Sequence, residues 1–123
     1  MIGYVTAGTN DFDKARDYYE ALMAELGASQ LYARGDFILW SSSMSVPGVA
    51  LVKPQNGEAA TVGNGTMVSL RADNETAVDR IHAKALELGS ADEGATGPRG
   101  GGFYGGYFRD LDGNKFCVFT VQS

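Results

Sequence analysis

The sequence has a single cysteine, Cys117, and no long apolar run. One cysteine cannot form a disulfide within the chain, which excludes a small secreted scaffold held together by disulfides. Apolar runs such as 37–40 and 49–52 are far shorter than the ~20 residues of a membrane-spanning helix. No basic N-terminal segment followed by an apolar stretch marks an export signal. We therefore expect a cytoplasmic protein that does not enter a membrane.

Basic residues and histidines are also scarce. Ten Lys and Arg stand against 15 Asp and Glu, so the formal net charge at pH 7 is −5. The bases are scattered, and such a chain lacks the positive stripe that binds nucleic acid. His82 is the only histidine and has no cysteine or second histidine at metal-ligand spacing, so we expect a structural or surface role for it. One histidine and no Gly-x-Ser-x-Gly motif also argue against a nucleophilic triad.

The 123 residues, of which 44% are apolar, fit one compact domain, and they contain a pattern that occurs twice. Segment 2–8 favours a strand, and 9–11 supplies short polar side chains suited to a helix N-cap. Apolar residues spaced by three and four over 11–26, followed by Gly27, predict an amphipathic helix. Three further strands are predicted at 30–34, 36–41 and 48–53.

The same order restarts after a polar, Gly-containing linker at 55–64. A shift of 62 positions aligns the first helix with a second one, from Ala15 on Ala77 to Gly27 on Gly89. We thus predict a single domain, 1–123, made of modules 1–54 and 65–123. The expected elements of the second module are a strand at 65–72, a helix capped by Asp73 or Asn74 and ending at Leu88, and strands at 103–109 and 115–121 joined by a turn at 110–114.

Two features suggest a ligand site but have a simpler explanation. Segment 94–106 contains seven glycines, yet it lacks the Lys-Ser/Thr ending of a phosphate-binding loop and does not open a helix. We expect a flexible loop that leads into a strand, where Gly105 and Gly106 let another group approach the backbone. The three aspartates between residues 11 and 17 lie in the first turns of a helix, where negative charge complements the helix dipole.

The two βαβββ units and the closing segment Phe-Arg-Asp-Leu-Asp-Gly-Asn-Lys at 108–115 resemble the vicinal oxygen chelate superfamily. This superfamily contains glyoxalase I, extradiol dioxygenases, fosfomycin-modifying thiol transferases and bleomycin resistance proteins. The resemblance covers essentially the whole chain, although Leu111 stands where relatives usually have proline. It implies an α+β fold in which two βαβββ modules form a curled mixed sheet around a cavity, with the helices on the outer face. It also implies a homodimer.

The resemblance further implies where a metal ion would bind. In metal-dependent members, a histidine in the first strand of each unit and a glutamate in the last strand are ligands; these positions fall on Tyr4, Met67 and Cys117. A further glutamate of glyoxalase I falls on Leu51. Ni, Zn, Mn and Fe require carboxylate or imidazole donors, which these residues do not supply. We therefore expect no metal ion and no other cofactor.

Side-chain alternation points to the same face of the strands. Tyr4, Met67 and Cys117 are each followed by a valine, which the two-residue period places on the opposite face, toward a helix. We predict an apolar and aromatic ligand-binding face with a few hydroxyls. Its predicted members are Tyr4, Thr6, Trp40, Leu51, Met67, Ser69, Tyr107, Cys117 and Phe119. Core filling remains the alternative for the aromatic residues. For Cys117, an inert buried thiol is favoured over a reactive one, because the sequence places no obvious cation beside it.

Three functions are compatible with this pattern. The first is a metal-free, glyoxalase- or bleomycin-resistance-like protein that binds a small organic molecule in its sheet cavity. The second is a glyoxalase-like or dioxygenase-like lyase or isomerase that uses Tyr4 or Tyr107 as acid or base in place of a metal ion. The third is a non-catalytic interaction module whose cavity is filled by its own side chains. The sequence does not identify the ligand.

Overall fold

The computed structural model describes residues 1–122, which divide into two compact units, one up to Val62 and one from Gly63 onward. Their boundary lies inside segment 55–64. Each unit has one strand, one helix and three strands in this order, as the repeat predicts, although the second unit has a strand at 91–100 where a loop was expected. The elements of the first unit are β1 (Tyr4–Gly8), α1 (Phe12–Ala24), β2 (Ser29–Arg34), β3 (Phe37–Ser41) and β4 (Gly48–Val52), and those of the second are β5 (Val68–Arg71), α2 (Glu75–Glu87), β6 (Ala91–Gly100), β7 (Phe103–Arg109) and β8 (Lys115–Val121).

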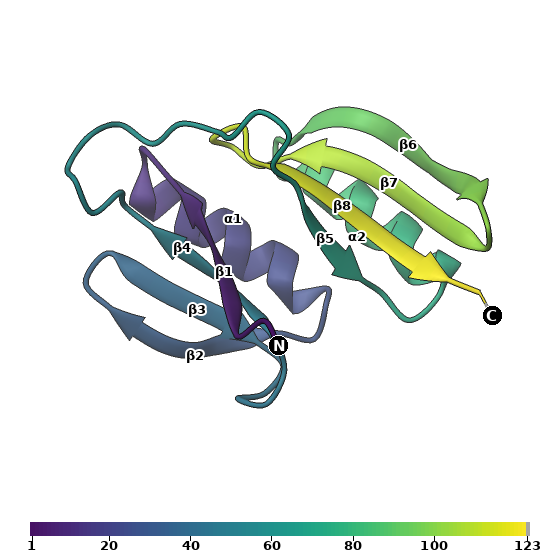
Figure 1. Ribbon diagram of the computed structural model, residues 1–123, viewed down its shortest axis with the longest axis horizontal. Coiled ribbons are helices and arrows are strands. Elements are labelled where there is room, and N and C mark those ends of the chain that lie inside the picture. Colours follow the sequence, from purple (N-terminus) through teal and green to yellow (C-terminus); the bar gives the residue numbers. More distant parts are fainter. Residues whose placement is uncertain (123) are drawn as a thin grey trace. The chain divides into compact units, whose positions relative to one another are not determined.

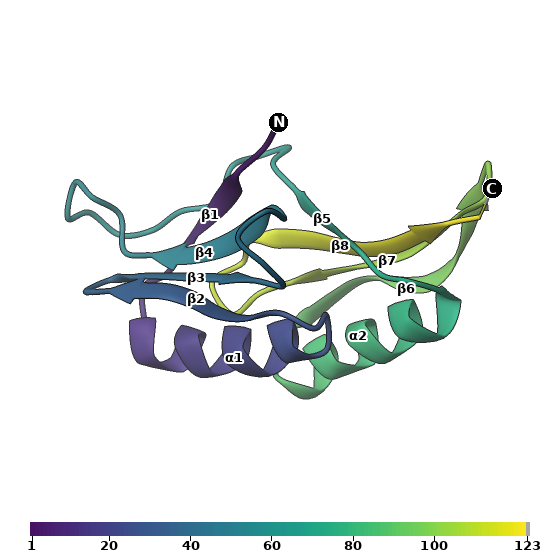
Figure 2. The ribbon, with the colours of Figure 1, turned by 90° about the horizontal axis from the view of Figure 1, so that it is seen from below.

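Each unit builds its own four-stranded mixed sheet (Figure 1). The strand orders are β1-β4-β3-β2 and β5-β8-β7-β6. The first strand of each unit pairs in parallel with the last, and the other pairs are antiparallel. In each unit the helix packs against one face of its own sheet (Figure 2). The predicted α+β fold of two βαβββ modules is confirmed.

Both helices begin at the caps that the sequence predicts. Asp11 accepts a hydrogen bond from the backbone N–H of Lys14 at 3.2 Å, and Asn74 accepts one from that of Ala77 at 2.9 Å. These caps satisfy backbone donors that have no partner within a helix. The first helix ends at Ala24, two residues before the predicted end, and Gly27 follows with a φ of 73°.

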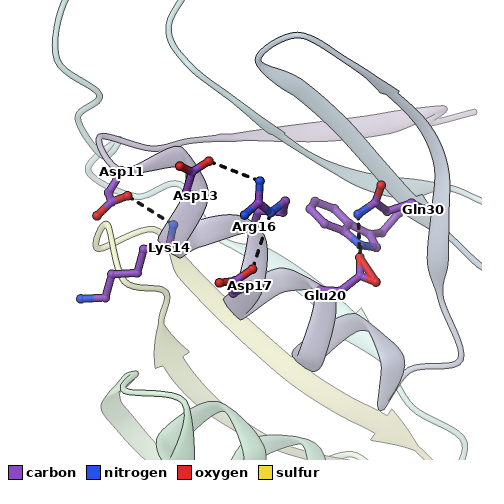
Figure 3. A network of polar contacts seen from close by, with 8 residues as sticks. Asp11, Asp13, Lys14, Arg16, Asp17, Glu20 and Gln30 are labelled. Carbon is purple, nitrogen blue, oxygen red and sulfur yellow. Dashed lines mark hydrogen bonds and ion pairs between the residues drawn. The ribbon is translucent and has the colours of Figure 1, made fainter.

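The acidic residues at the start of α1 serve the helix itself (Figure 3). Arg16 lies 3.3 Å from a carboxylate oxygen of Asp13 and 3.5 Å from one of Asp17. Asp11 is the N-cap. The expected capping role agrees with the contacts of Asp11, whereas Asp13 and Asp17 pair with Arg16.

The glycine-rich segment 94–106 differs from its prediction. It is not a flexible loop, because residues up to Gly100 belong to β6, which pairs with β7 in an antiparallel hairpin. The register shifts three times along this pair. Backbone hydrogen bonding to β7 therefore imposes the strand although glycine has a low strand propensity. The segment ends in a strand hairpin and not at a helix N-terminus, unlike a phosphate-binding loop.

Close approach to the backbone at Gly106 is confirmed. A Cβ atom at this position would lie 2.7 Å from Cγ2 of Thr96 and 3.0 Å from Cδ2 of His82. Glycine at this position therefore allows α2 and β6 to pack closely against β7.

The core of each unit lies between its helix and its sheet. In the first unit the fully buried side chains of Tyr19 and Leu22 on α1 face Trp40 and Leu51 on the sheet. In the second, Val78 and Ile81 on α2 face buried residues of β7 and β8 that include Phe108, Phe116 and Val118. Neither helix of residues 1–122 is long and apolar enough to cross a lipid bilayer.

Candidate functional site

The face of each sheet opposite its helix is here called the open face. In the second unit, the Cβ position of Gly106 on β7 points toward His82 of α2. Because side chains alternate along a strand, Gly105 lies on the open face and the side chain of Tyr107 projects from it. The register between β7 and β8 then places Cys117 and Phe119 on the open face, and Val118 toward the helix. In this strand the predicted alternation of cavity residue and helix-facing valine agrees with the structure.

A row of polar and aromatic side chains crosses the open face of the second unit. Ser69 on β5 is the register partner of Cys117 on β8, which is in turn the partner of Tyr107 on β7. Cys117 is fully buried, whereas Ser69 is exposed and Tyr107 is half-buried. Three predicted site residues from three strands are thus neighbours, and Phe119 lies on the same face of β8.

Met67 is a predicted site residue that lies outside strand β5. It precedes β5, which begins at Val68 rather than at residue 65, and its side chain is 41% exposed. The predicted strand is too long because Gly65 and Thr66 form a turn with Gly63, whose carbonyl accepts the Thr66 N–H.

The open face of the first unit is aromatic. Tyr4 is 51% exposed, and its ring lies edge-on to Phe37, with centroids 5.8 Å apart. Tyr32 of β2 makes a similar contact with Phe37 at 5.9 Å. Thr6 lies two residues from Tyr4 on β1, so its exposed side chain projects from the same face.

Trp40 and Leu51 do not lie on this open face. The Trp40 ring is 1% exposed, stacks on Tyr19 of α1 with centroids 5.7 Å apart, and donates from Nε1 to Glu20 at 2.7 Å. Gln30 donates to the same Glu20 oxygen at 2.8 Å (Figure 3). Leu51 is fully buried and pairs with the buried Ala7, which has the opposite parity to Tyr4. The prediction that both residues line the cavity face is corrected, since both fill the core under α1.

Three basic side chains, which the sequence reasoning did not place at the site, lie against aromatic rings of the open face of the second unit. Arg71 lies over Phe119, with its guanidinium carbon 5.1 Å from the ring centroid. Arg99 and the ammonium of Lys115 lie 5.5 and 5.6 Å from the centroid of Tyr107. We call Arg71, Arg99 and Lys115 the cation cluster. Within residues 1–122 none of the three forms an ion pair with a carboxylate.

Gly97 makes room for Arg99. A Cβ atom at Gly97 would lie 3.2 Å from a guanidinium nitrogen of Arg99, and one at Gly94 would lie 3.0 Å from Cδ2 of Tyr107. The guanidinium donates to the carbonyl oxygens of Ala95 and Pro98. The glycine-rich segment therefore lets a long cationic side chain lie along the backbone of β6 and reach Tyr107. The signal in the sequence was the pair of glycines, Gly94 and Gly97, that precedes Arg99.

The surroundings of Cys117 set the reactivity of its thiol. Burial raises the pKa of Cys117, while hydrogen bonding to Ser69, the charge of Arg99, hydrogen bonding to Tyr107 and the charge of Lys115 oppose the rise. The net direction is upward, so the thiol is protonated at neutral pH. The sequence predicts no cation beside Cys117, and this prediction is wrong because Arg99 and Lys115 lie near it. Burial nevertheless changes the pKa of the thiol more than these two charges do.

His82 of α2 lies between this helix and β7. It is buried, and its Nε2 is 3.1 Å from the carbonyl oxygen of Tyr107 and 3.4 Å from a carboxylate oxygen of Asp92. Both neighbours are acceptors, which suits a donating Nε2–H. These contacts join α2 to β6 and β7, as a structural role requires.

The donor set does not fit the metal ion that the resemblance implies. Tyr4 offers a phenol, Cys117 a fully buried thiol and Met67 only a thioether, and Leu51 is a buried aliphatic residue. Within residues 1–122 no three His, Cys, Asp or Glu side chains gather in a group that could hold a metal ion. Divalent metal ions of this class need nitrogen or oxygen donors at these positions.

Comparison with known proteins agrees with this architecture. The family model described as Glyoxalase/Bleomycin resistance protein/Dioxygenase superfamily matches residues 1–118. The crystal structure of a glyoxalase/bleomycin resistance protein from Albidiferax ferrireducens T118 is 30% identical to this chain, with a TM-score of 0.91 and 99% of each chain covered. No curated protein matches the sequence.

Two more distant structures are similar in fold alone. A lactoylglutathione lyase from Agrobacterium tumefaciens is 21% identical, with a TM-score of 0.69 and with 98% of this chain and 92% of that chain covered. A glyoxalase/bleomycin resistance protein/dioxygenase family enzyme from Burkholderia phytofirmans PsJN is 16% identical, with a TM-score of 0.77 and 98% of each chain covered.

Proposed function

The chain belongs to the glyoxalase/bleomycin resistance protein/dioxygenase superfamily, and from this we propose that it binds a small organic molecule on an open sheet face without a metal ion. One observation carries the proposal. The open face of the second unit keeps a hydroxyl, a thiol and a phenol in one row, at Ser69, Cys117 and Tyr107, while the family's ligand positions lack carboxylate and imidazole groups. A few polar groups among aromatic surroundings are typical of small-molecule sites.

Binding is tested with protein that has been dialysed against a chelator. A panel of aromatic and aliphatic metabolites and antibiotics is added to ¹⁵N-labelled protein, and amide shifts are recorded. We expect at least one compound to shift the amides of Ser69, Tyr107 and Cys117 in a saturable way. Trp40 fluorescence is a poor readout, because the indole packs on α1. A panel that leaves these amides unmoved, or binding that requires added metal, would contradict the proposal.

A second candidate function is lyase or isomerase chemistry with a tyrosine as acid or base. It is favoured at Tyr107, whose ring has two cations within 5.6 Å and whose strand partner is Cys117. Tyr4 contacts an aromatic ring and lies in the other unit. If the protein turns over a substrate, Tyr107→Phe should abolish the turnover. Tyr4→Phe removes the same hydroxyl from the other candidate residue and should leave the turnover unchanged. Unchanged turnover in Tyr107→Phe would exclude that role.

The family resemblance also leads us to propose a homodimer. The exposed aromatic residues Tyr4 and Tyr32 on the first unit are compatible with a covered surface. Light scattering coupled to gel filtration measures the mass directly, and a mass of one chain at all concentrations would exclude the homodimer.

A further inference from the structure

We propose that the ligand of the second unit is an organic anion, whose negative group binds the cation cluster and whose apolar body lies over the row formed by Ser69, Cys117 and Tyr107. This inference rests on the proposed small-molecule function and specifies the chemical class of the ligand. A carboxylate, sulfonate or phosphate group on a compact organic body has the required chemistry.

The strand register brings the three cations to one face. Lys115 is two residues from Cys117 on β8, and therefore projects from the same face. Arg71 pairs with Phe119, the next open-face residue of β8 in the other direction. Arg99 reaches Tyr107, the partner of Cys117 on β7. The cations thus approach the buried Cys117 from three strands.

Charge distribution makes the cluster unusual for this protein. The chain has a net charge of −5 and only ten basic residues, yet three of them lie together here. The nearby Glu93 does not neutralise them, because its carboxylate is paired with Arg109. A surface that concentrates uncompensated charge of the minority sign attracts a ligand of the opposite sign.

The hydrogen-bond donors of the cluster are largely unused. The side chains of Arg71 and Lys115 donate no hydrogen bond to another residue within 1–122. Arg99 uses part of its guanidinium on two backbone carbonyls. A guanidinium has five donors and an ammonium three, and carboxylate or phosphate oxygens are their strongest partners.

The floor of the site favours an apolar body beside the charged group. Cys117 is fully buried, and the rings of Phe103 and Phe119 stack with centroids 5.1 Å apart. Gly105 adds no side chain between them. The rings of Phe103 and Phe119 are only half-buried, and an inorganic ion would use the cations but leave the exposed part of these rings in water, so we infer an organic anion rather than a free inorganic one.

Two fluorescent probes of similar shape separate the charge from the apolar contact. 1-Anilinonaphthalene-8-sulfonate carries a negative charge, and N-phenyl-1-naphthylamine does not. Both are titrated into wild-type protein, and binding is located by the amide shifts of Ser69, Tyr107 and Cys117. We expect the sulfonate to bind about tenfold more tightly, because charge-assisted hydrogen bonds to ions are worth roughly this factor.

Charge-removing variants test the individual cations. Arg71→Gln and Arg99→Gln should each weaken sulfonate binding by about threefold, since the two cations share the tenfold advantage of the charged probe, and leave the neutral probe unaffected. Arg34→Gln on β2 of the other unit removes the same charge from an exposed position and should change neither affinity. Thermal unfolding of each variant confirms that the fold is intact.

The outcomes separate the two proposals. If both probes bind equally at these amides and Arg71→Gln has no effect, the ligand is not selected by charge and the anion inference is overturned, while the small-molecule function stands. Equal weakening in Arg34→Gln would reveal unspecific attraction and would also overturn the inference. If neither probe moves these amides and the metabolite panel also fails, both proposals fail together. Sulfonate binding that phosphate alone displaces at equal concentration would point to a site for a free inorganic anion and overturn the organic class.

Discussion

At the scale of single residues, burial and charge compete at Cys117, and burial prevails. Because the pKa of the thiol is raised by burial, the thiolate fraction at neutral pH is smaller than that of a free cysteine. We expect iodoacetamide to alkylate the folded protein far more slowly than the protein unfolded in guanidinium. The rate should rise with pH beyond the ordinary thiol range. Equal rates in the folded and unfolded protein at pH 7, measured by mass spectrometry, would contradict this.

A second residue-scale prediction concerns Asp79 on α2. Hydrogen bonding from Thr96, followed by that from Tyr104, lowers the pKa of this carboxyl, and the Tyr104 hydroxyl lies 2.7 Å from it. Thr96→Val and Tyr104→Phe should therefore each raise the pKa of Asp79, as followed by NMR of the carboxyl carbon. Tyr32→Phe, in the other unit, should leave it unchanged.

The sign of the effect on stability follows from the same shift. A carboxyl with a lower pKa in the folded state stabilises the protein above its unfolded pKa, and this contribution is lost as the pH falls through the folded value. The stability difference between wild type and Thr96→Val should therefore shrink on acidification below the unfolded pKa of Asp79. A difference that grows in acid would contradict the assignment.

At the scale of elements, the packing of α2 on β7 depends on a missing side chain. Gly106→Ala would place a Cβ atom 3.0 Å from Cδ2 of His82 on α2 and 2.7 Å from Cγ2 of Thr96 on β6. Such overpacking costs about 1–3 kcal/mol in the free energy of unfolding, measured by urea denaturation. Gly3→Ala is the matched control, because no atom lies within 4 Å of its Cβ position, and it should be nearly neutral. Similar losses in both would contradict the packing argument.

The helices could be predicted because their information is local. Asp11 and Asn74 supply the caps, and apolar spacing marks the buried side of each helix. Strand β6 could not be predicted, because Gly94 and Gly97 carry no strand signal and the strand exists only through its ladder with β7.

The candidate site was predicted only in part, because side-chain alternation is local whereas strand pairing is not. Alternation predicted the sheet face on which Cys117 and Phe119 lie. It could not reveal that Trp40 fills the core beneath α1, since the parity of β3 depends on its register with β4. The position of Arg99 depends on the unpredicted β6, so the cation cluster was missed.

At the scale of the whole molecule, we expect the protein to hold no catalytic metal. After incubation with Ni, Zn, Mn or Fe(II) and thorough desalting, elemental analysis should find far less than one equivalent per chain, because the positions of the family's ligands carry unsuitable donors. One equivalent retained against a weak chelator would contradict the alignment of Tyr4, Met67 and Cys117 with those ligands. It would restore the metal-dependent activities of the superfamily as candidates.

The parallel pairing of β5 with β8 also has a consequence for the order of folding. Strands β6, β7 and β8 follow one another through short turns, whereas β5 meets β8 only after the chain has passed through α2 and both other strands. Closing that long loop is entropically costly. The three-stranded meander should therefore assemble first and β5 should dock last, so that amide exchange in the native protein is fastest at β5. Because β5 carries Ser69 and Arg71, the rim of the proposed binding face is the last part of its unit to form and the first to open.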